Sequence, residues 1–335
     1  MTTLYLTQPG TYVRLERDSL VIQQGYEQRT VRLSELELIL FYPGVQLTSA
    51  VLAELLDRGI ETLFMRQDGS FRGRLQGHLA SNPLQRQAQY KYLETLWGLT
   101  WAQRIVEGKI NNQRVLLQRR HRASAGRIHE LAESIDIIAA YLHSLKHLPH
   151  PDRETLMGIE GICARTYYQA LRHYFPSSWN FQGRNRQPPR DPINALLSWG
   201  YGVLLSRLFA ACVMAGLDPY LGFFHANLPY RPNLALDLME EFRPIVVDAT
   251  VITIVTANLL SPEDFQPSPD GEGVWLSPLA KKIYLAELEK RFREPILYPP
   301  QSRRLSIQQI LLEQARWLGR CLVSGFLDYE PMVIR

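Results

Sequence analysis

The chain has 335 residues, of which 46% are hydrophobic and 21% charged, and its formal net charge is +4. This composition excludes an intrinsically disordered protein, and the length is sufficient for two domains or for one large core with a smaller module. The weak positive charge permits nucleic-acid binding without arguing for it, because local patches of charge matter more than the total.

The first part of the chain, up to about residue 77, alternates short apolar runs with turn dipeptides. This pattern predicts strands and hairpins that begin near Leu4, Tyr12, Leu20, Thr30, Leu36, Glu61 and Phe71, the last two joined across Asp68-Gly69. One helix interrupts the strands over residues 50–56, with Thr48 or Ser49 as its N-cap and Gly59 at its end. We therefore expect a small β-rich domain over residues 1–82.

Beyond Ser81-Asn82-Pro83 the apolar residues recur at helical spacing almost to the end of the chain. Two helix starts are clear, at Asp152 and at Asp191-Pro192. The Asp side chain accepts a backbone N–H of the first helical turn, and Pro at the first helical position lacks an N–H that would otherwise have no partner. Residues 83–335 are predicted to form a large all-α domain, so the chain is α+β with two domains. Its helices are expected at 85–106, one or two within 109–145, 152–174, 191–216, 234–260 with a break or kink at Pro244, 278–293 and 305–322.

Several classes of protein find no support in the sequence. The three cysteines form no CxxC pair, which argues against a zinc site and a disulfide framework. The N-terminus has no basic segment followed by an apolar run, and the apolar stretches 201–216 and 244–260 are too short to span a bilayer. Phosphate-loop, dinucleotide-binding, GxSxG and HExxH motifs are missing. We expect a cytoplasmic protein with reduced, buried cysteines.

An acidic segment in the helix predicted from residue 234 is a candidate metal site. Asp237, Glu240 and Glu241 are three and four residues apart, so a helix places them toward one side. Three neighbouring carboxylates repel one another unless a cation, a basic partner or water lies between them. With His225 in the preceding loop they offer oxygen and nitrogen ligands for Mg²⁺ or Mn²⁺. A solvated acidic face and a plain surface histidine remain the alternative interpretations.

Glu160 lies within the apolar stripe of the helix predicted over residues 152–174. An unpaired carboxylate on a buried face is costly, so it must be protonated, paired with a cation or bound to a metal. Pairing with Arg153 or Arg165 is the structural alternative. The flanking Gly158 and Gly161 weaken the helix, which is most easily explained if backbone or a ligand approaches closely there.

Two groups of arginines are candidates for contact with nucleic acid. Arg184, Arg186 and Arg190 follow Trp179 and Phe181, and guanidinium groups beside aromatic rings suit a phosphate backbone or an unstacked base. A second group of five arginines lies within residues 114–127. For each group, a solvated surface is the alternative interpretation.

Four ordered segments of this chain resemble a known family, the CRISPR-associated integrases of spacer acquisition. They are Gly158-Ile-Glu160-Gly161 and the segments 188–201, 216–225 and 234–244; residues 109–114 also look like the family. The resemblance spans most of the chain and implies a β-rich N-terminal module followed by a helical catalytic domain. It implies that Glu160, His225 and Glu240 bind the metal, with Asp237 a supporting acid in the same site. Some members have Asp at the position of Glu240.

The resemblance also implies an activity and partners. The activity is that of a Mg²⁺- or Mn²⁺-dependent DNA endonuclease and integrase, in which the 3′-hydroxyl of a DNA fragment attacks a repeat-end phosphodiester and inserts a spacer into a CRISPR array. His225 either ligates the metal or transfers a proton. The implied partners are double-stranded DNA, a second copy of the chain bound through residues 1–82, and a small ferredoxin-like subunit. The alternatives are a non-catalytic DNA-binding scaffold of the same fold and, from composition alone, a metabolic enzyme with a small-molecule site.

Overall fold

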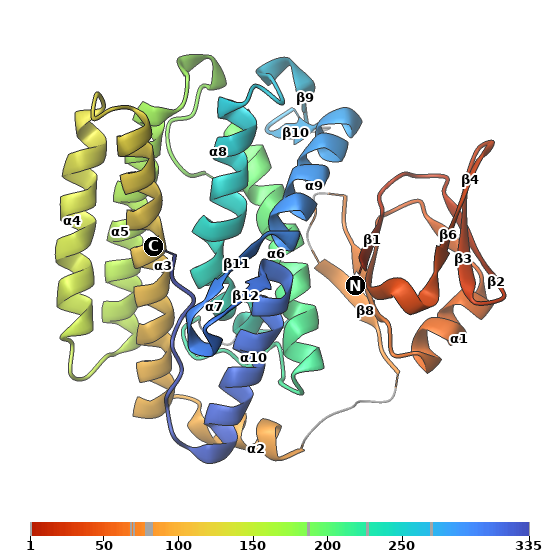
Figure 1. The fold of residues 1–335 in the computed structure, drawn as a ribbon, viewed down its shortest axis with the longest axis horizontal. Helices are drawn as coiled ribbons and strands as arrows, with labels where there is room; N and C mark the ends of the chain where they lie inside the picture. The colour runs from red at the N-terminus through yellow and green to blue at the C-terminus, as the bar shows by residue number, and fades with distance from the viewer. Residues whose placement is uncertain are drawn as a thin grey trace. The chain divides into compact units, whose positions relative to one another are not determined.

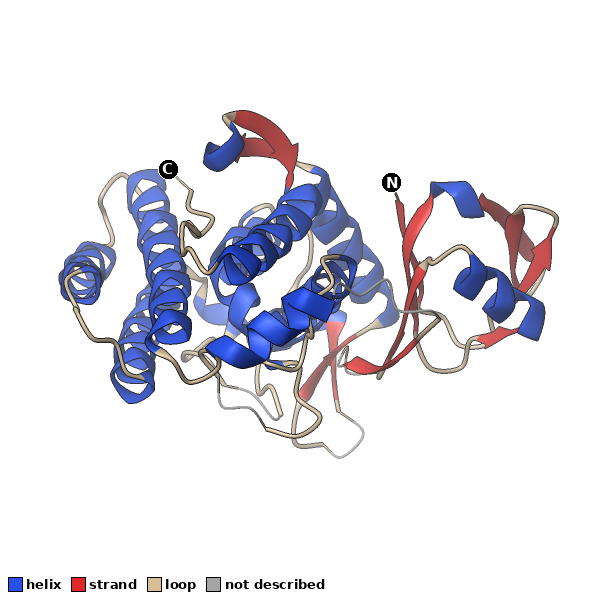
Figure 2. Ribbon diagram, turned by 90° about the horizontal axis from the view of Figure 1, so that it is seen from below, coloured by secondary structure: helices blue, strands red, loops and turns tan. Residues whose placement is uncertain are grey.

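The chain divides into two units, Met1–Ser81 and Asn82–Arg335, which are described separately (Figure 1). The structure is a computed structural model, and it describes residues 2–67, 69, 71–77, 83–185, 188–225, 228–268 and 271–334. The first unit is rich in strands and the second in helices (Figure 2).

The N-terminal unit consists of two four-stranded sheets and a short helix, α1 (Ser49–Asp57), which Thr48 caps by accepting the backbone N–H of Val51. One sheet has the order β1 (Thr2–Leu6), β5 (Leu36–Phe41), β7 (Glu61–Met65), β8 (Phe71–Leu75). The other has the order β4 (Glu27–Arg32), β3 (Ser19–Gln24), β2 (Tyr12–Glu16), β6 (Gln46–Leu47). A 3₁₀ turn, Leu33–Glu35, precedes β5.

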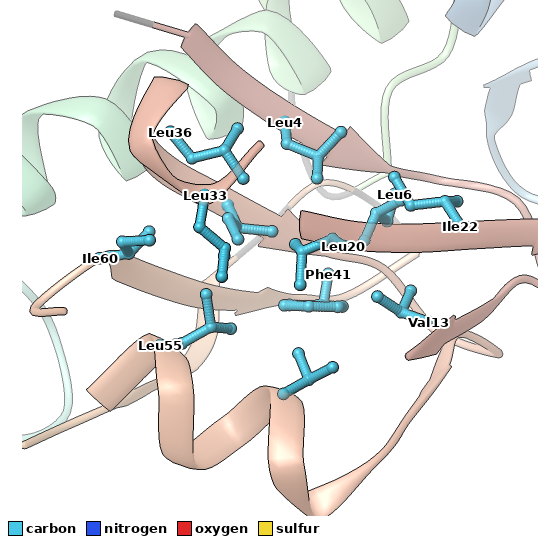
Figure 3. Close-up of a cluster of buried hydrophobic side chains, with 12 residues drawn as sticks. Leu4, Leu6, Val13, Leu20, Ile22, Leu33, Leu36, Phe41, Leu55 and Ile60 are labelled. Carbon is cyan, nitrogen blue, oxygen red and sulfur yellow. The ribbon is translucent and has the colours of Figure 1, made fainter. Parts of the chain in front are cut away.

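Both sheets and α1 bury one face in a common apolar core (Figure 3). Leu4 and Leu6 from β1, Leu20 from β3 and Leu55 from α1 are among its members. The residues alternate along β1 because successive side chains of a strand point to opposite faces. The predicted strands are confirmed, but β1, β5 and β7 pair in parallel, which hairpin signals do not predict. Asp68, in the predicted turn between β7 and β8, lies outside the described residues.

The C-terminal unit is mainly helical, as predicted, but it is not all-α. Its helices are α2 (Pro83–Tyr92), α3 (Leu96–Ala123), α4 (His129–Lys146), α5 (Arg153–Tyr174), α6 (Pro192–Met214), α7 (Asn233–Phe242), α8 (Ala249–Thr256), α9 (Pro278–Arg293) and α10 (Ile307–Ser324). Two short antiparallel hairpins join them, β9 (Phe265–Pro267) with β10 (Val274–Leu276) and β11 (Pro295–Tyr298) with β12 (Arg303–Ser306). The described part of this unit also contains three 3₁₀ turns: Ser177–Trp179, Pro262–Asp264 and Pro299–Gln301.

The prediction of one helix over residues 85–106 is wrong, because the chain breaks between α2 and α3. Glu94 takes a left-handed conformation with φ of 55°, and the Thr95 hydroxyl then accepts the backbone N–H of Gly98 as the N-cap of α3. A residue with positive φ cannot continue a right-handed helix. From this start α3 runs without interruption to Ala123, through the gap expected between 106 and 109.

Two predicted helices begin at their expected caps. Asp152 and Asp191 accept the N–H groups of Thr155 and Asn194, at 2.9 and 2.8 Å, and so cap α5 and α6. Among the described helices, α6 is long and apolar enough to cross a membrane by length and composition, but 78% of its most apolar stretch is buried inside the structure. This burial is what the core helix of a folded domain shows.

Three consecutive helices, α3, α4 and α5, pack side by side, and α3 also packs against α7 (Figures 1 and 2). After α7 the chain forms a wider π-helical turn, Arg243–Asp248, before α8. Pro244 has no N–H for a helical hydrogen bond and its ring crowds the preceding turn, so the regular helix changes there. The predicted irregularity at Pro244 is confirmed. Of the helices named here, α3 packs against both α5 and α7.

Candidate active site

Lys109 on α3 joins the two predicted acids that come from different helices. Its ammonium group donates to Oε1 of Glu160 on α5 and lies 2.5 Å from Oε2 of Glu240 on α7. The Lys109 side chain is 9% exposed and that of Glu240 is 4% exposed, so the contact is largely shielded from water. Glu160 is therefore paired with a cation, as its position on an apolar stripe requires, but the partner is Lys109 and not Arg153 or Arg165.

Cationic neighbours keep the buried Glu240 carboxylate ionised. Burial by itself raises the pKa of Glu240, but the charges of Arg243, Lys109 and His225 outweigh it and lower the pKa to about 2. Burial likewise favours the neutral amine of Lys109, and the charges of Glu160 and Glu240 outweigh it and raise the pKa of Lys109. The site thus holds opposite charges in a shielded environment.

Asp237 anchors the loop that carries His225. Its carboxylate is fully buried and accepts the backbone N–H groups of Phe223, Phe224 and His225 at 2.7, 2.9 and 3.0 Å. The same carboxylate lies 2.6 Å from Nδ1 of His225, which places the ring proton on Nδ1 in the neutral imidazole. Asp237 therefore sets the position and orientation of the histidine.

His225 directs its second ring nitrogen toward the acids. Nε2 lies 3.8 Å from Oε1 of Glu240, and 18% of the His225 side chain is exposed. The interpretation of His225 as a plain surface residue is wrong. Because Nδ1 is engaged by Asp237, Nε2 is the nitrogen that is free to ligate a metal or to accept a proton.

Glu241 does not belong to this group, although its spacing predicts a shared face with Asp237 and Glu240. It accepts hydrogen bonds from the Tyr329 hydroxyl at 2.8 Å and the Met332 N–H at 2.6 Å, and also from Gln314. Burial raises the pKa of Glu241 to about 8, against the opposing effect of these hydrogen bonds. Glu241 anchors the C-terminal segment. Asp237, Glu240 and Glu241 are all buried, so the interpretation of a solvated acidic face is also wrong.

The π-helical turn after α7 brings a second buried network next to the site. Arg243 Nε donates to Oε1 of Glu240 at 3.0 Å, and its guanidinium lies 4.5 Å from the centre of the Tyr201 ring. Tyr167 and Tyr201 both donate to Asp248, at 2.9 Å for Tyr167. Burial raises the pKa of Asp248 to about 6, and the two hydrogen bonds oppose the rise. This network holds Arg243 beside Glu240.

The sequence interpretation did not identify Lys109, Arg243 or Asp248 as parts of the site. Lys109 lies among the buried residues Val106, Ile110 and Gln113 of α3, and a lysine at such a position indicates a buried charge. A cation in an apolar stripe requires a partner for the same reason as an acid. A local signal for Arg243 is its spacing of three residues from Glu240, because oppositely charged residues three apart on a helix are neighbours.

The donor atoms suit a hard divalent cation. Two carboxylates and one imidazole are the oxygen and nitrogen ligands that Mg²⁺ and Mn²⁺ accept. Among the described residues, no three His, Cys, Asp or Glu side chains are already close enough to hold an ion. The position between Glu160 and Glu240 nevertheless holds a positive charge, the Lys109 ammonium. The residues present therefore fit a metal once that ammonium moves aside.

The arginine segment upstream of α6 is partly structural. Arg184 donates to Asn194 at 2.8 Å and to Ser198 at 3.1 Å. Trp179 and Phe181 are each 4% exposed, so their rings are packed inside the structure and do not present a face to a base. Arg190 is exposed, and Arg186 lies outside the described residues.

The two glycines beside Glu160 border open space. A Cβ atom on Gly158 or Gly161 would meet nothing within 4 Å in the part of the chain that the structure describes. Close packing among the described residues therefore does not explain these glycines, and the approach of a ligand stays a prediction from the sequence.

Comparison with known proteins agrees with the resemblance seen in the motifs. A family model described as CRISPR associated protein Cas1 matches residues 4–290. The CRISPR-associated endonuclease Cas1 3 of Thermus thermophilus is 34% identical over 97% of this chain and 98% of its own length.

Solved structures share the fold. A casposase bound to its integration product superposes with a TM-score of 0.85 and 22% identity, over 98% of this chain and 93% of that one. A chain of a Cas6-RT-Cas1–Cas2 complex has a TM-score of 0.83 and 23% identity, over 99% of this chain and 36% of that one. At these identities the structures establish likeness of fold alone.

Proposed function

Because this chain belongs to the Cas1 family of CRISPR-associated proteins, we propose that it is a divalent-metal-dependent DNA endonuclease and integrase of spacer acquisition. In the proposed reaction the 3′-hydroxyl of a DNA fragment attacks a phosphodiester at the end of a CRISPR repeat. A new strand junction forms, the old 3′-oxygen leaves, and no nucleotide triphosphate is consumed. One observation carries the proposal: Glu160 and Glu240, from two separate helices, both contact the Lys109 ammonium, and Nε2 of His225 lies 3.8 Å from Oε1 of Glu240.

Glu160, Glu240 and Nε2 of His225 are the groups that would hold Mg²⁺ or Mn²⁺. When bound, such an ion supplies positive charge that stabilises the phosphate oxygens during transfer. Asp237 keeps Nδ1 of His225 occupied, so that Nε2 remains directed toward Glu240. Arg243 holds Oε1 of Glu240 and adds a further positive charge beside this proposed ligand.

The proposed partners follow from the family and from the neighbours. One structural neighbour is a casposase bound to an integration product, and another is part of a Cas6-RT-Cas1–Cas2 complex. We therefore propose that this chain binds double-stranded DNA, with Arg190 as one contact, and works with a small partner subunit of the Cas2 type. Residues 1–82 would form the contact between two copies of the chain, and the cytoplasm is the expected compartment.

A strand-transfer assay with Mn²⁺ tests the proposed function. Glu160→Ala and His225→Ala should each lose activity by about a hundredfold or more, because each removes a proposed ligand. Glu154→Ala and His173→Ala are matched controls, because both residues are exposed on α5. These substitutions remove a carboxylate and an imidazole, as the test variants do, but outside the site. They should retain the activity of the unaltered chain. Equal activity in all four variants would end the catalytic assignment and favour the DNA-binding scaffold.

A further inference from the structure

The position between Glu160 and Glu240 is filled by a side chain of the protein itself. Lys109 reaches from α3 and contacts one oxygen of each carboxylate. Arg243 takes the other oxygen of Glu240, Oε1, so the two cations divide the Glu240 carboxylate between them. The residue exposure of Lys109 is 7%, which leaves its ammonium dependent on these two acids for compensation.

Two carboxylates from facing helices repel one another unless a positive charge lies between them. Lys109 provides that charge, and it ties α3, α5 and α7 together at one point. A Mg²⁺ ion ligated by the same acids would lie about 2.0–2.1 Å from their oxygens. An ammonium at its present position would then be in direct contact with the ion, with like charges in a shielded environment. The ammonium and the ion therefore exclude one another.

We propose that Lys109 is a built-in counter-cation, which occupies the place of the metal in the metal-free chain and is displaced from between Glu160 and Glu240 when the metal binds. This inference rests on the proposed function, because it assumes that these acids ligate a metal. It assigns Lys109 a positioning role with two effects of opposite sign. The lysine holds the three helices in place without metal, and it lowers the affinity for metal by competing with it.

The sign of one measurement separates this role from a purely structural one. If Lys109 only holds the acids in position, its removal disorders them and weakens the binding of metal. If Lys109 competes with the metal, its removal strengthens binding while the metal-free chain becomes less stable. Arg207→Met is the matched control, because Arg207 is also a buried cation in an ion pair, with Glu289, and belongs to α6.

The experiment uses the full chain at pH 7.5 and measures free Mn²⁺ by electron paramagnetic resonance during titration. Lys109→Met and Lys109→Gln should bind Mn²⁺ about tenfold more tightly than the unaltered chain, and Arg207→Met should leave the affinity unchanged. In thermal unfolding, Lys109→Met should melt at a lower temperature without metal and show a larger rise on addition of Mn²⁺. A variant that binds Mn²⁺ equally well or more weakly overturns the inference and leaves the proposed function standing.

A second measurement needs no variant and covers the case in which both substitutions prevent folding. Mass spectrometry follows the rate at which a small amine-modifying reagent labels Lys109 in the unaltered chain, with and without saturating Mg²⁺. Displacement should make Lys109 label faster with the metal, whereas unchanged protection overturns the inference. If neither the unaltered chain nor the Lys109 variants bind Mn²⁺, the proposed metal site fails and this inference fails with it. If only the variants bind, Lys109 blocks the metal but is not displaced by it, which overturns the inferred displacement and refutes metal-dependent activity of the unaltered chain.

Discussion

Glu240 and Glu241 are adjacent in the chain, but their surroundings favour opposite protonation states. Glu240 lies among Lys109, Arg243 and His225, and Glu241 is enclosed by neutral donors near the C-terminus. Replacement of each by glutamine keeps the shape and removes the charge. We expect Glu240→Gln to destabilise the helical unit and abolish strand transfer. Glu241→Gln should do neither.

The pKa values set the size of the expected difference. The pKa of Glu240 falls from 4.5 to about 2, and at about 1.4 kcal/mol per pH unit the ionised carboxylate stabilises the folded state by about 3 kcal/mol at pH 7. That stability is present above about pH 4.5 and is lost as the pH falls toward 2. Glutamine removes it at neutral pH.

The sign is reversed for Glu241. Its pKa rises from 4.5 to about 8, so the folded state retains a proton that the unfolded state releases, and stability falls as the pH rises between these values. At pH 7 this linkage lowers the stability of the unaltered chain by about 3 kcal/mol, and glutamine, which does not titrate, avoids that loss. Glutamine also makes a less favourable hydrogen bond than the carboxyl group, which costs about 1 kcal/mol. We therefore expect Glu241→Gln to be at least as stable as the unaltered chain at pH 7.

Urea unfolding at pH 7 in the presence of EDTA measures the difference. All six tryptophans follow residue 82, so their fluorescence reports on the helical unit alone. The same preparations are then assayed for strand transfer with Mn²⁺. The reasoning is refuted if Glu241→Gln loses more stability than Glu240→Gln, or if Glu240→Gln transfers strands as well as the unaltered chain.

Three further predictions concern single residues. Asp237→Asn should lower the unfolding free energy by about 2–4 kcal/mol and reduce strand transfer, because an amide nitrogen cannot accept the N–H groups of residues 223–225. Urea unfolding measures the first effect and the strand-transfer assay the second, and a variant as stable as the unaltered chain would contradict the anchoring role. Relative to the unaltered chain, Asp248→Asn should gain about 2.4 kcal/mol of unfolding free energy between pH 4 and pH 7, because the pKa of Asp248 rises from 3.8 to about 6 and the chain that carries this carboxyl loses stability as the pH rises across that interval; a difference in unfolding free energy that does not change with pH would oppose this explanation. Glu94→Gly should stabilise the helical unit by up to about 1 kcal/mol in thermal unfolding because φ is positive there, and Glu94→Ala, the control, should not.

Features that depend on neighbours along the chain could be predicted from the sequence. Asp152 and Asp191 each accept an N–H group three residues further on, and the strands of the N-terminal unit follow from alternation over a few residues. The importance of Glu160 was also predictable, because a carboxylate in an apolar stripe requires a partner wherever the helix packs. These properties are local, and the amino-acid order carries them directly.

The identity of the partners was decided only by the tertiary structure. Helical periodicity predicts on which face of its helix Glu160 lies. It does not predict that Lys109, 51 residues earlier in the chain, faces it. It assigns Asp237, Glu240 and Glu241 to one side, yet Glu240 meets α3 and Glu241 meets the C-terminal segment, because they point about 100° apart on a helix of 3.6 residues per turn. Contacts between distant segments depend on how whole helices pack, and a pattern read along one helix contains no information about the surface opposite it.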